Sequence, residues 1–86
     1  MHEASLMNDL MRKIFEVAGN EEGRVTSVSV WLGALSHMSP THFREHYEES
    51  SKGTIAEGAA LKIEMSDDVH HANAQDILLK NVEVTV

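Results

Sequence analysis

The residues best suited to chemistry are the first three, Met1, His2 and Glu3. The α-amine of Met1, the backbone amide of His2 and the His2 imidazole can offer three nitrogens to one ion and close two adjoining chelate rings. A planar set of nitrogens suits Ni(II) and Cu(II), and imidazole alone favours Zn, Cu or Ni over Mg or Ca. Glu3 can complete the set with its amide or carboxylate. The competing interpretation is a frayed chain end with a solvated histidine, because histidine at the second position permits this chelate without proving it.

A second group of candidate ligands is the adjacent pair His70 and His71, which follows Asp67 and Asp68. Two imidazoles and two carboxylates so close together can serve a borderline metal ion, and their loop can reach back to complete the coordination at His2. The alternative is a solvated acidic loop that contains two histidines, because spacing in a flexible loop constrains little. His70 and His71 are therefore secondary candidates.

His42 and His46 stand four residues apart, a spacing that brings both rings to one face of a helix. This pattern fits either a two-histidine metal site or a pH-sensitive patch. No third ligand is fixed by the spacing as it is in a zinc protease motif. An exposed polar face with Glu45 and Glu49 nearby is the favoured interpretation.

Composition narrows the function classes. Eighty-six residues predict a single domain, 1–86, near the lower end of what can bury a core. The chain has no cysteine, so disulfides, thiolate zinc sites, iron–sulfur clusters and a cysteine nucleophile are excluded. A formal charge of -7 disfavours nucleic acid and acidic membrane surfaces as partners. No convergent catalytic set, bilayer-spanning run or signal peptide is evident, which predicts a cytoplasmic protein that is not an enzyme.

The elements that must position these residues follow from hydrophobic periodicity. Apolar residues recur at spacings of three and four from Ala4 to Ala18, which predicts an amphipathic helix that begins directly behind the N-terminal site. The segment from Arg24 to Leu32 predicts a strand. Its expected core face carries Thr26, Val28, Val30 and Leu32, and Trp31 is expected on the other face, as a satellite core contact or beneath a loop or partner.

The second half of the chain predicts one helix and two strands. Ser39 and Pro40 are typical of a helix start, and Phe43 and Tyr47 give that helix an apolar face as far as about Ser50. Alternation predicts a strand over residues 59–65, and the polar segment 66–76 is expected to be a loop. The last strand spans 77–86, with Lys80 as a local exception to the apolar face formed by Leu78, Val82, Val84 and Val86.

The expected fold class is α/β (α+β), with element order α-β-α-β-β. Three strands form a small sheet, and two α-helices pack on one face of it, because this arrangement buries all the apolar stripes economically. Exposed edge strands in such a small sheet also suggest strand exchange or edge pairing in a homodimer.

Several stretches resemble one family, the HypA/HybF accessory proteins that deliver nickel during the maturation of hydrogenase and sometimes urease. The stretches that carry the resemblance cover most of the chain and are Met1-His2-Glu3-Ala4-Ser5-Leu6, Val28-Ser29-Val30-Trp31-Leu32-Gly33-Ala34-Leu35, Gly53-Thr54-Ile55-Ala56-Glu57-Gly58-Ala59 and Asn81-Val82-Glu83-Val84. In that family the opening Met-His-Glu is the nickel site. The resemblance therefore implies that His2 is the principal Ni(II) ligand, beside the Met1 amine and the amide or side chain of Glu3.

The chain departs from the family in one large respect. Family members carry a zinc module built on two Cys-x-x-Cys pairs between their second and third strands, and here the loop 66–76 takes its place without any cysteine. No zinc is therefore expected. Either this is a natural branch without the module or the module has been removed, and the sequence leaves both open.

The resemblance implies a nickel metallochaperone that serves nickel–iron hydrogenase. Its implied partners are a HypB-type nickel GTPase and the hydrogenase large subunit. The alternative is a zinc-free interaction module that has kept the fold and lost metal delivery. Partner binding that survives His2→Ala would favour that alternative.

Overall fold

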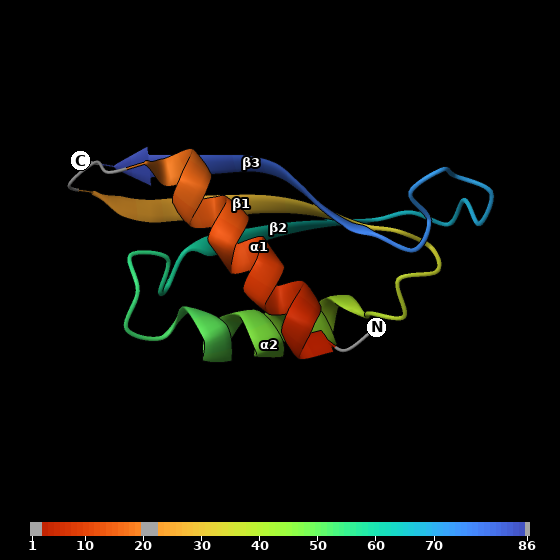
Figure 1. The fold of residues 1–86 in the computed structure, drawn as a ribbon, viewed down its shortest axis with the longest axis horizontal. Helices are drawn as coiled ribbons and strands as arrows, with labels where there is room; N and C mark the ends of the chain where they lie inside the picture. Colours follow the sequence, from red (N-terminus) through yellow and green to blue (C-terminus); the bar gives the residue numbers. More distant parts are fainter. Residues whose placement is uncertain (1–2, 20–22, 86) are drawn as a thin grey trace.

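The computed structural model describes residues 3–19 and 23–85, which form two helices and three strands in the expected order (Figure 1). The elements are α1 Glu3–Ala18, β1 Arg24–Leu32, α2 Pro40–Ser51, β2 Ala60–Met65 and β3 Ile77–Thr85. The predicted order is confirmed, and each observed boundary lies within one residue of its predicted position.

The sheet has the order β2-β1-β3, so β1 is the central strand. β1 pairs with β2 in parallel and with β3 in antiparallel fashion. A parallel pair needs a crossover connection, and α2 supplies it between β1 and β2. Figure 1 shows α1 crossing the strands obliquely, with α2 beneath it on the side of β2. Both helices bury their apolar faces in one common core, as expected.

The core lies between the helices and one face of the sheet. From α2 it takes Phe43 and Tyr47, which are 0% and 2% exposed, as their spacing predicts. Val28, Val30 and Leu32 of β1 are fully covered. The remaining buried apolar residues of this cluster are Met7, Leu10, Met11, Ile14, Ala18, Val25, Met38 and Ala56.

One prediction about β1 was wrong, because Thr26 is exposed and its neighbour Val25 is buried. The pairing with β3 shifts between Val25 and Ser27, so Thr26 is an extra residue in the ladder. Its hydroxyl donates to the carbonyl of Glu83 across the strands. Such a bulge moves every residue before it to the opposite face, which simple alternation cannot foresee.

A matching irregularity on β3 corrects the prediction for Leu78. Lys80 is the unpaired residue between Leu79 and Asn81, so the alternation inverts there. Ile77 and Leu79 therefore face the core before the shift, and Val82 and Val84 face it afterwards. Leu78 lies opposite Trp31, whose neighbours Val30 and Leu32 face the core, so Leu78 belongs to the outer face. The exception noted at Lys80 marks the site of the bulge.

The segment 66–76 is a loop, as predicted, and it is tied to the end of β1. Ser66 N–H donates to the Leu32 carbonyl, and Gly33 N–H donates to the Asp76 carbonyl, both at 2.9 Å. A Cβ atom on Gly33 would lie 2.2 Å from the carbonyl oxygen of Ala74, so only glycine fits beneath the loop. The loop is a series of docked turns.

Candidate metal-binding site

The first helix positions Glu3, the first of the described residues. α1 begins at Glu3, and its buried stripe includes Met7, Met11 and Ile14. It ends at Ala18, and the following Gly19 adopts a φ of +70° and donates its N–H to the Phe15 carbonyl at 3.0 Å. The core therefore fixes the direction in which α1 presents its first residue.

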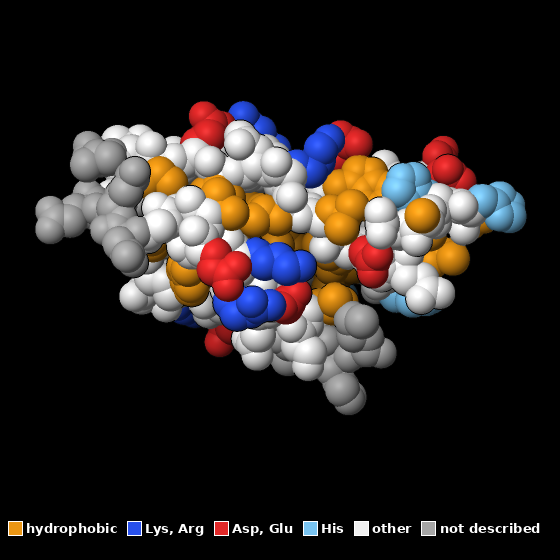
Figure 2. Space-filling model, turned by 45° about the horizontal axis from the view of Figure 1, so that its top comes forward, with side chains coloured by type: hydrophobic (Ala, Val, Ile, Leu, Met, Phe, Trp, Pro, Cys, Tyr) orange, Lys and Arg blue, Asp and Glu red, His pale blue; other side chains and the backbone are white. Residues whose placement is uncertain are grey.

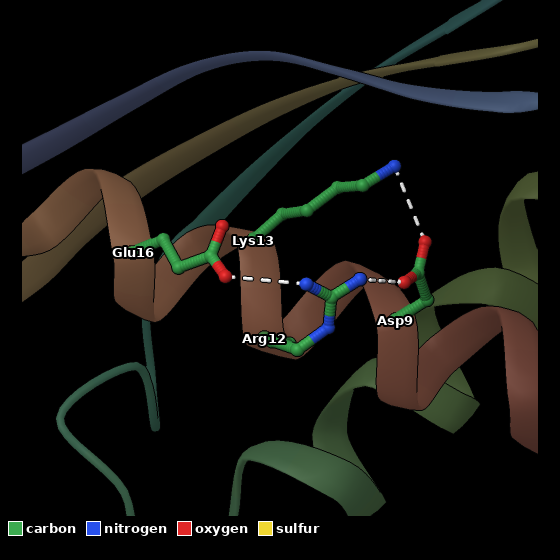
Figure 3. A network of polar contacts seen from close by, with 4 residues as sticks. All are labelled: Asp9, Arg12, Lys13 and Glu16. Atoms are coloured by element: carbon green, nitrogen blue, oxygen red, sulfur yellow. Dashed lines mark hydrogen bonds and ion pairs between the residues drawn. The ribbon is translucent and has the colours of Figure 1, made fainter.

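The exposed side of α1 holds a small ionic network (Figure 3). Arg12 lies between Asp9 and Glu16, contacting both, and Lys13 approaches Asp9 at 3.2 Å. The hydrogen bond from Arg12, followed by that from Lys13, lowers the pKa of the Asp9 carboxyl below its ordinary value. These groups neutralise one another and are exposed, so this side of α1 is an ordinary solvated face.

The principal predicted ligands lie at the edge of what the structure describes. Met1 and His2 are outside the described residues, and Glu3 is the first residue of α1. Their assignment to a metal site stays a prediction from the sequence. The N-terminal end of α1 disfavours a cation near residue 3, because the positive end of the helix macrodipole lies there. An anionic ligand is needed to compensate.

The histidine pair on α2 lies as its spacing predicts. Ser39 caps this helix by accepting the N–H of His42 at 3.1 Å, and Pro40 starts it. The rings of His42 and His46 face one another with centroids 4.7 Å apart, and both residues are half-buried. One face of α2 therefore carries both imidazoles, and their rings lie close to each other.

The second histidine group occupies the docked loop, and Figure 2 shows histidine side chains gathered at that end of the molecule. Within the loop, Asp68 accepts the N–H of His70 through its carboxylate at 3.0 Å, and Ser66 accepts the N–H of Asp68 at 3.1 Å. These local turns give the loop a defined shape and commit one oxygen of Asp68 to the backbone.

His71 is engaged on two sides. Its ring lies 4.9 Å from that of Trp31, and its Nδ1 accepts the N–H of Asn73 at 2.9 Å. An accepting Nδ1 leaves the proton of a neutral imidazole on Nε2. A metal ion at either nitrogen would therefore break the bond from Asn73, directly at Nδ1 or by moving the proton there from Nε2. This cost weighs against His71 as a ligand while the loop keeps this shape.

The described residues contain no ready-made metal cage. Within residues 3–19 and 23–85, no three His, Cys, Asp or Glu side chains come together in a way that could hold an ion. The structure brings His42 to His46 and His71 to Trp31, and it does not gather His70 and His71 with their neighbouring carboxylates. The sequence predicts Trp31 on the outer face, as a satellite core contact or beneath a loop or partner, but does not indicate His71 as its neighbour. The feature of the sequence that could have indicated a covering loop is an aromatic residue, Trp31, on the outer face directly before the end of its strand.

Comparison with known proteins identifies the family, which the geometry of the site does not. A family model described as "Hydrogenase/urease nickel incorporation, metallochaperone, hypA" matches residues 1–83. The chain belongs to the HypA family. Within that family it is 39% identical over 64 residues to hydrogenase maturation factor HypA of Archaeoglobus fulgidus. It is 41% identical over 64 residues to that of Rhizobium leguminosarum bv. viciae and 35% identical over 66 residues to that of Methylocella silvestris.

These alignments cover 73%, 73% and 76% of this chain and 58%, 57% and 58% of the respective relatives. The chain therefore spans less than two thirds of the HypA relatives it matches. The resemblance seen in the opening residues and in the strand and turn motifs is confirmed at the level of the family. None of the helices in the described ranges is long and apolar enough to cross a membrane.

Proposed function

We propose that this chain is a nickel metallochaperone that binds Ni(II) at its N-terminus and delivers it for the maturation of a nickel–iron hydrogenase. The observation that carries the proposal is membership of the HypA family together with the opening sequence Met1-His2-Glu3. Nickel is the cargo in this scheme, and the protein performs transfer and not turnover. Residues 1–86 act as one nickel-binding domain.

The donor chemistry of the first residues suits such a task. His2 is the principal ligand through its imidazole and backbone nitrogen, the Met1 amine provides a further nitrogen, and Glu3 completes the set with its amide or carboxylate. Nitrogen donors in a planar array favour Ni(II). An ion held at an open chain end can exchange its ligands one at a time with a partner, whereas a closed structural site would retain it. The partners proposed for this exchange are a HypB-type nickel GTPase and the hydrogenase large subunit, in the cytoplasm.

Zinc has no place in the proposed chemistry. The 86 residues include no cysteine, so they cannot build a zinc site from thiolates. The loop 66–76, which stands where the family carries its zinc module, is stabilised by its own turns and by its contacts with β1. The proposed nickel site therefore acts without a thiolate zinc site among residues 1–86.

Calorimetric nickel titration of the protein with an unmodified N-terminus tests the proposal. One ion is expected to bind tightly, and His2→Ala and a version with two extra N-terminal residues are both expected to lose that binding. Affinity is expected to fall as pH drops, because protons compete for the amine, amide and imidazole. A double variant, His70→Ala with His71→Ala, is the matched control and should bind like the parent.

The outcomes separate the candidate sites. Equal binding by the parent, His2→Ala and the extended version would refute the N-terminal site. If the His70→Ala and His71→Ala control then lost nickel, the loop would be the ligand source. Tight binding that is independent of pH would also contradict a site made of these three nitrogens. Binding of the GTPase that survives His2→Ala, with no nickel transfer by the parent, would favour an interaction module.

A further inference from the structure

The two edges of the sheet are protected to different extents. β3 carries the bulge at Lys80, which hinders pairing with another strand. β2 runs from Ala60 to Met65 with an unbroken register against β1. It is therefore the regular edge of the sheet.

The direction of the free backbone groups of β2 follows from its pairing. Ser66 N–H donates to the Leu32 carbonyl at 2.9 Å, and in a parallel ladder alternate residues of each strand bond to the neighbour. The even-numbered residues of β2 therefore bond to β1. Leu61, Ile63 and Met65 direct their N–H and C=O groups away from it, and within the described residues no backbone or side-chain partner is seen for them.

Side chains of opposite charge alternate on the outer face of the same strand. Lys62 lies 3.5 Å from Glu83, and Glu64 lies 3.2 Å from Lys80, so both point to the face away from the helices. On the core side, Leu61 and Ile63 are only half-buried and Met65 is 52% exposed. The edge thus combines free backbone, exposed apolar surface and one charge of each sign.

We propose that β2 pairs in antiparallel fashion with β2 of a second copy of this chain, with Ile63 at the two-fold axis. Residues with outward backbone groups then face each other, Ile63 opposite Ile63 and Leu61 opposite Met65, and each such pair exchanges two hydrogen bonds. Lys62 lies opposite Glu64 of the partner, twice by symmetry, in the closely spaced pairs where side chains interact most strongly.

The charges select this register over its neighbours. A shift that centres the pair on position 62 sets lysine against lysine, and a shift that centres it on 64 sets glutamate against glutamate. Like charges directly opposite one another destabilise a sheet. The existing pairs with Glu83 and Lys80 are exposed and weak, so the partner's charges can share or replace them. The result is one continuous six-stranded sheet.

Analytical ultracentrifugation over a range of concentrations, without metal, tests the pairing. The parent is expected to show a monomer–dimer equilibrium. Lys62→Glu and Glu64→Lys, each alone, are expected to weaken it by about 10- to 30-fold, because two attractive pairs become repulsive. An equimolar mixture of these two variants is expected to form a heterodimer, because all four opposed charges are then complementary. Lys13→Glu serves as the control, since it makes the same change of charge as Lys62→Glu on α1, away from β2.

A second variant tests the backbone directly. Ile63→Pro removes an N–H that points away from β1 and is expected to abolish the dimer while circular dichroism stays unchanged. Ile63→Val is its control and should dimerise. A parent that stays monomeric up to millimolar concentration would overturn the proposal, as would a dimer that neither charge variant nor Ile63→Pro weakens. Nickel binding plays no part in these measurements, so their outcome is independent of the metallochaperone proposal.

Discussion

At the scale of single residues, the buried face of α2 was predicted well and the polar contact within it was not. The spacing of Phe43 and Tyr47 identified both as core residues. The Tyr47 hydroxyl donates to the carbonyl of Ala56 at 2.9 Å, and no pattern in the sequence indicates that acceptor. Its position depends on the tight turns between Gly53 and Ala59. Likewise, the sequence identified His42 and His46 as one face of a helix, but their ring separation required coordinates.

Tyr47→Phe is expected to lower the free energy of unfolding by about 0.5–1.5 kcal/mol, because one buried hydrogen bond is lost and the Ala56 carbonyl keeps the N–H of Ala59. Burial raises the pKa of Tyr47 from 10.0 to about 12. Its contribution to stability is therefore complete below pH 10 and lost between about pH 10 and 12, where the unfolded chain ionises first. Denaturant unfolding of parent and variant across this range measures the effect.

The chain has a single tyrosine, so absorbance of the phenolate reports on Tyr47 alone. Ionisation near pH 10 in the folded protein would contradict the burial argument, and so would an equally steep alkaline loss of stability in the phenylalanine variant.

At the scale of elements, the sequence predicted existence, order and boundaries, and failed where a ladder gains a residue. Alternation over Arg24–Leu32 placed Thr26 inside, and the bulge there reverses the assignment for the start of β1. In β3, the alternation of apolar and polar residues is already interrupted at Lys80 in the sequence. A bulge depends on both strands at once, and a pattern within one strand shows only half of it.

Gly33→Ala is expected to destabilise the protein by roughly 1–3 kcal/mol, since the added methyl group overlaps the Ala74 carbonyl and must push the loop away from β1. The single tryptophan, Trp31, lies against His71 of that loop, so its fluorescence should change as well. Thermal unfolding and emission spectra measure both effects. Ala72→Ser, at an exposed position of the same loop, should leave both unchanged, and a Gly33→Ala protein that behaved like it would disprove the close approach.

At the scale of the whole molecule, the amino-acid composition determines the net charge, and the ion pairs in the structure do not offset it. Fourteen acidic and seven basic residues leave a net charge of -7 on a chain of 86 residues. The ion pairs described on α1 and on the outer sheet face are exposed and contribute little. Self-repulsion is therefore the dominant electrostatic term for the folded state.

Added salt is accordingly expected to raise the midpoint of thermal unfolding of the dilute protein, because screening relieves the excess negative charge more than it weakens the surface pairs. Potassium chloride and choline chloride should act alike if the effect is screening alone. A midpoint that falls with salt would show that the ion pairs outweigh the net charge.

Loop 66–76 is a suitable place to insert a small guest domain, because both of its ends are fixed to the end of β1. Ser66 and Asp76 bond to Leu32 and Gly33, which are consecutive in the chain, so the loop leaves and re-enters the sheet on the two sides of the end of β1. Its two ends are therefore about 10 Å apart, which is two strand spacings. A small domain inserted there needs N- and C-termini that lie close together. A small fluorescent reporter grafted between these anchors should leave the strands undisturbed, far along the sheet from its C-terminal end.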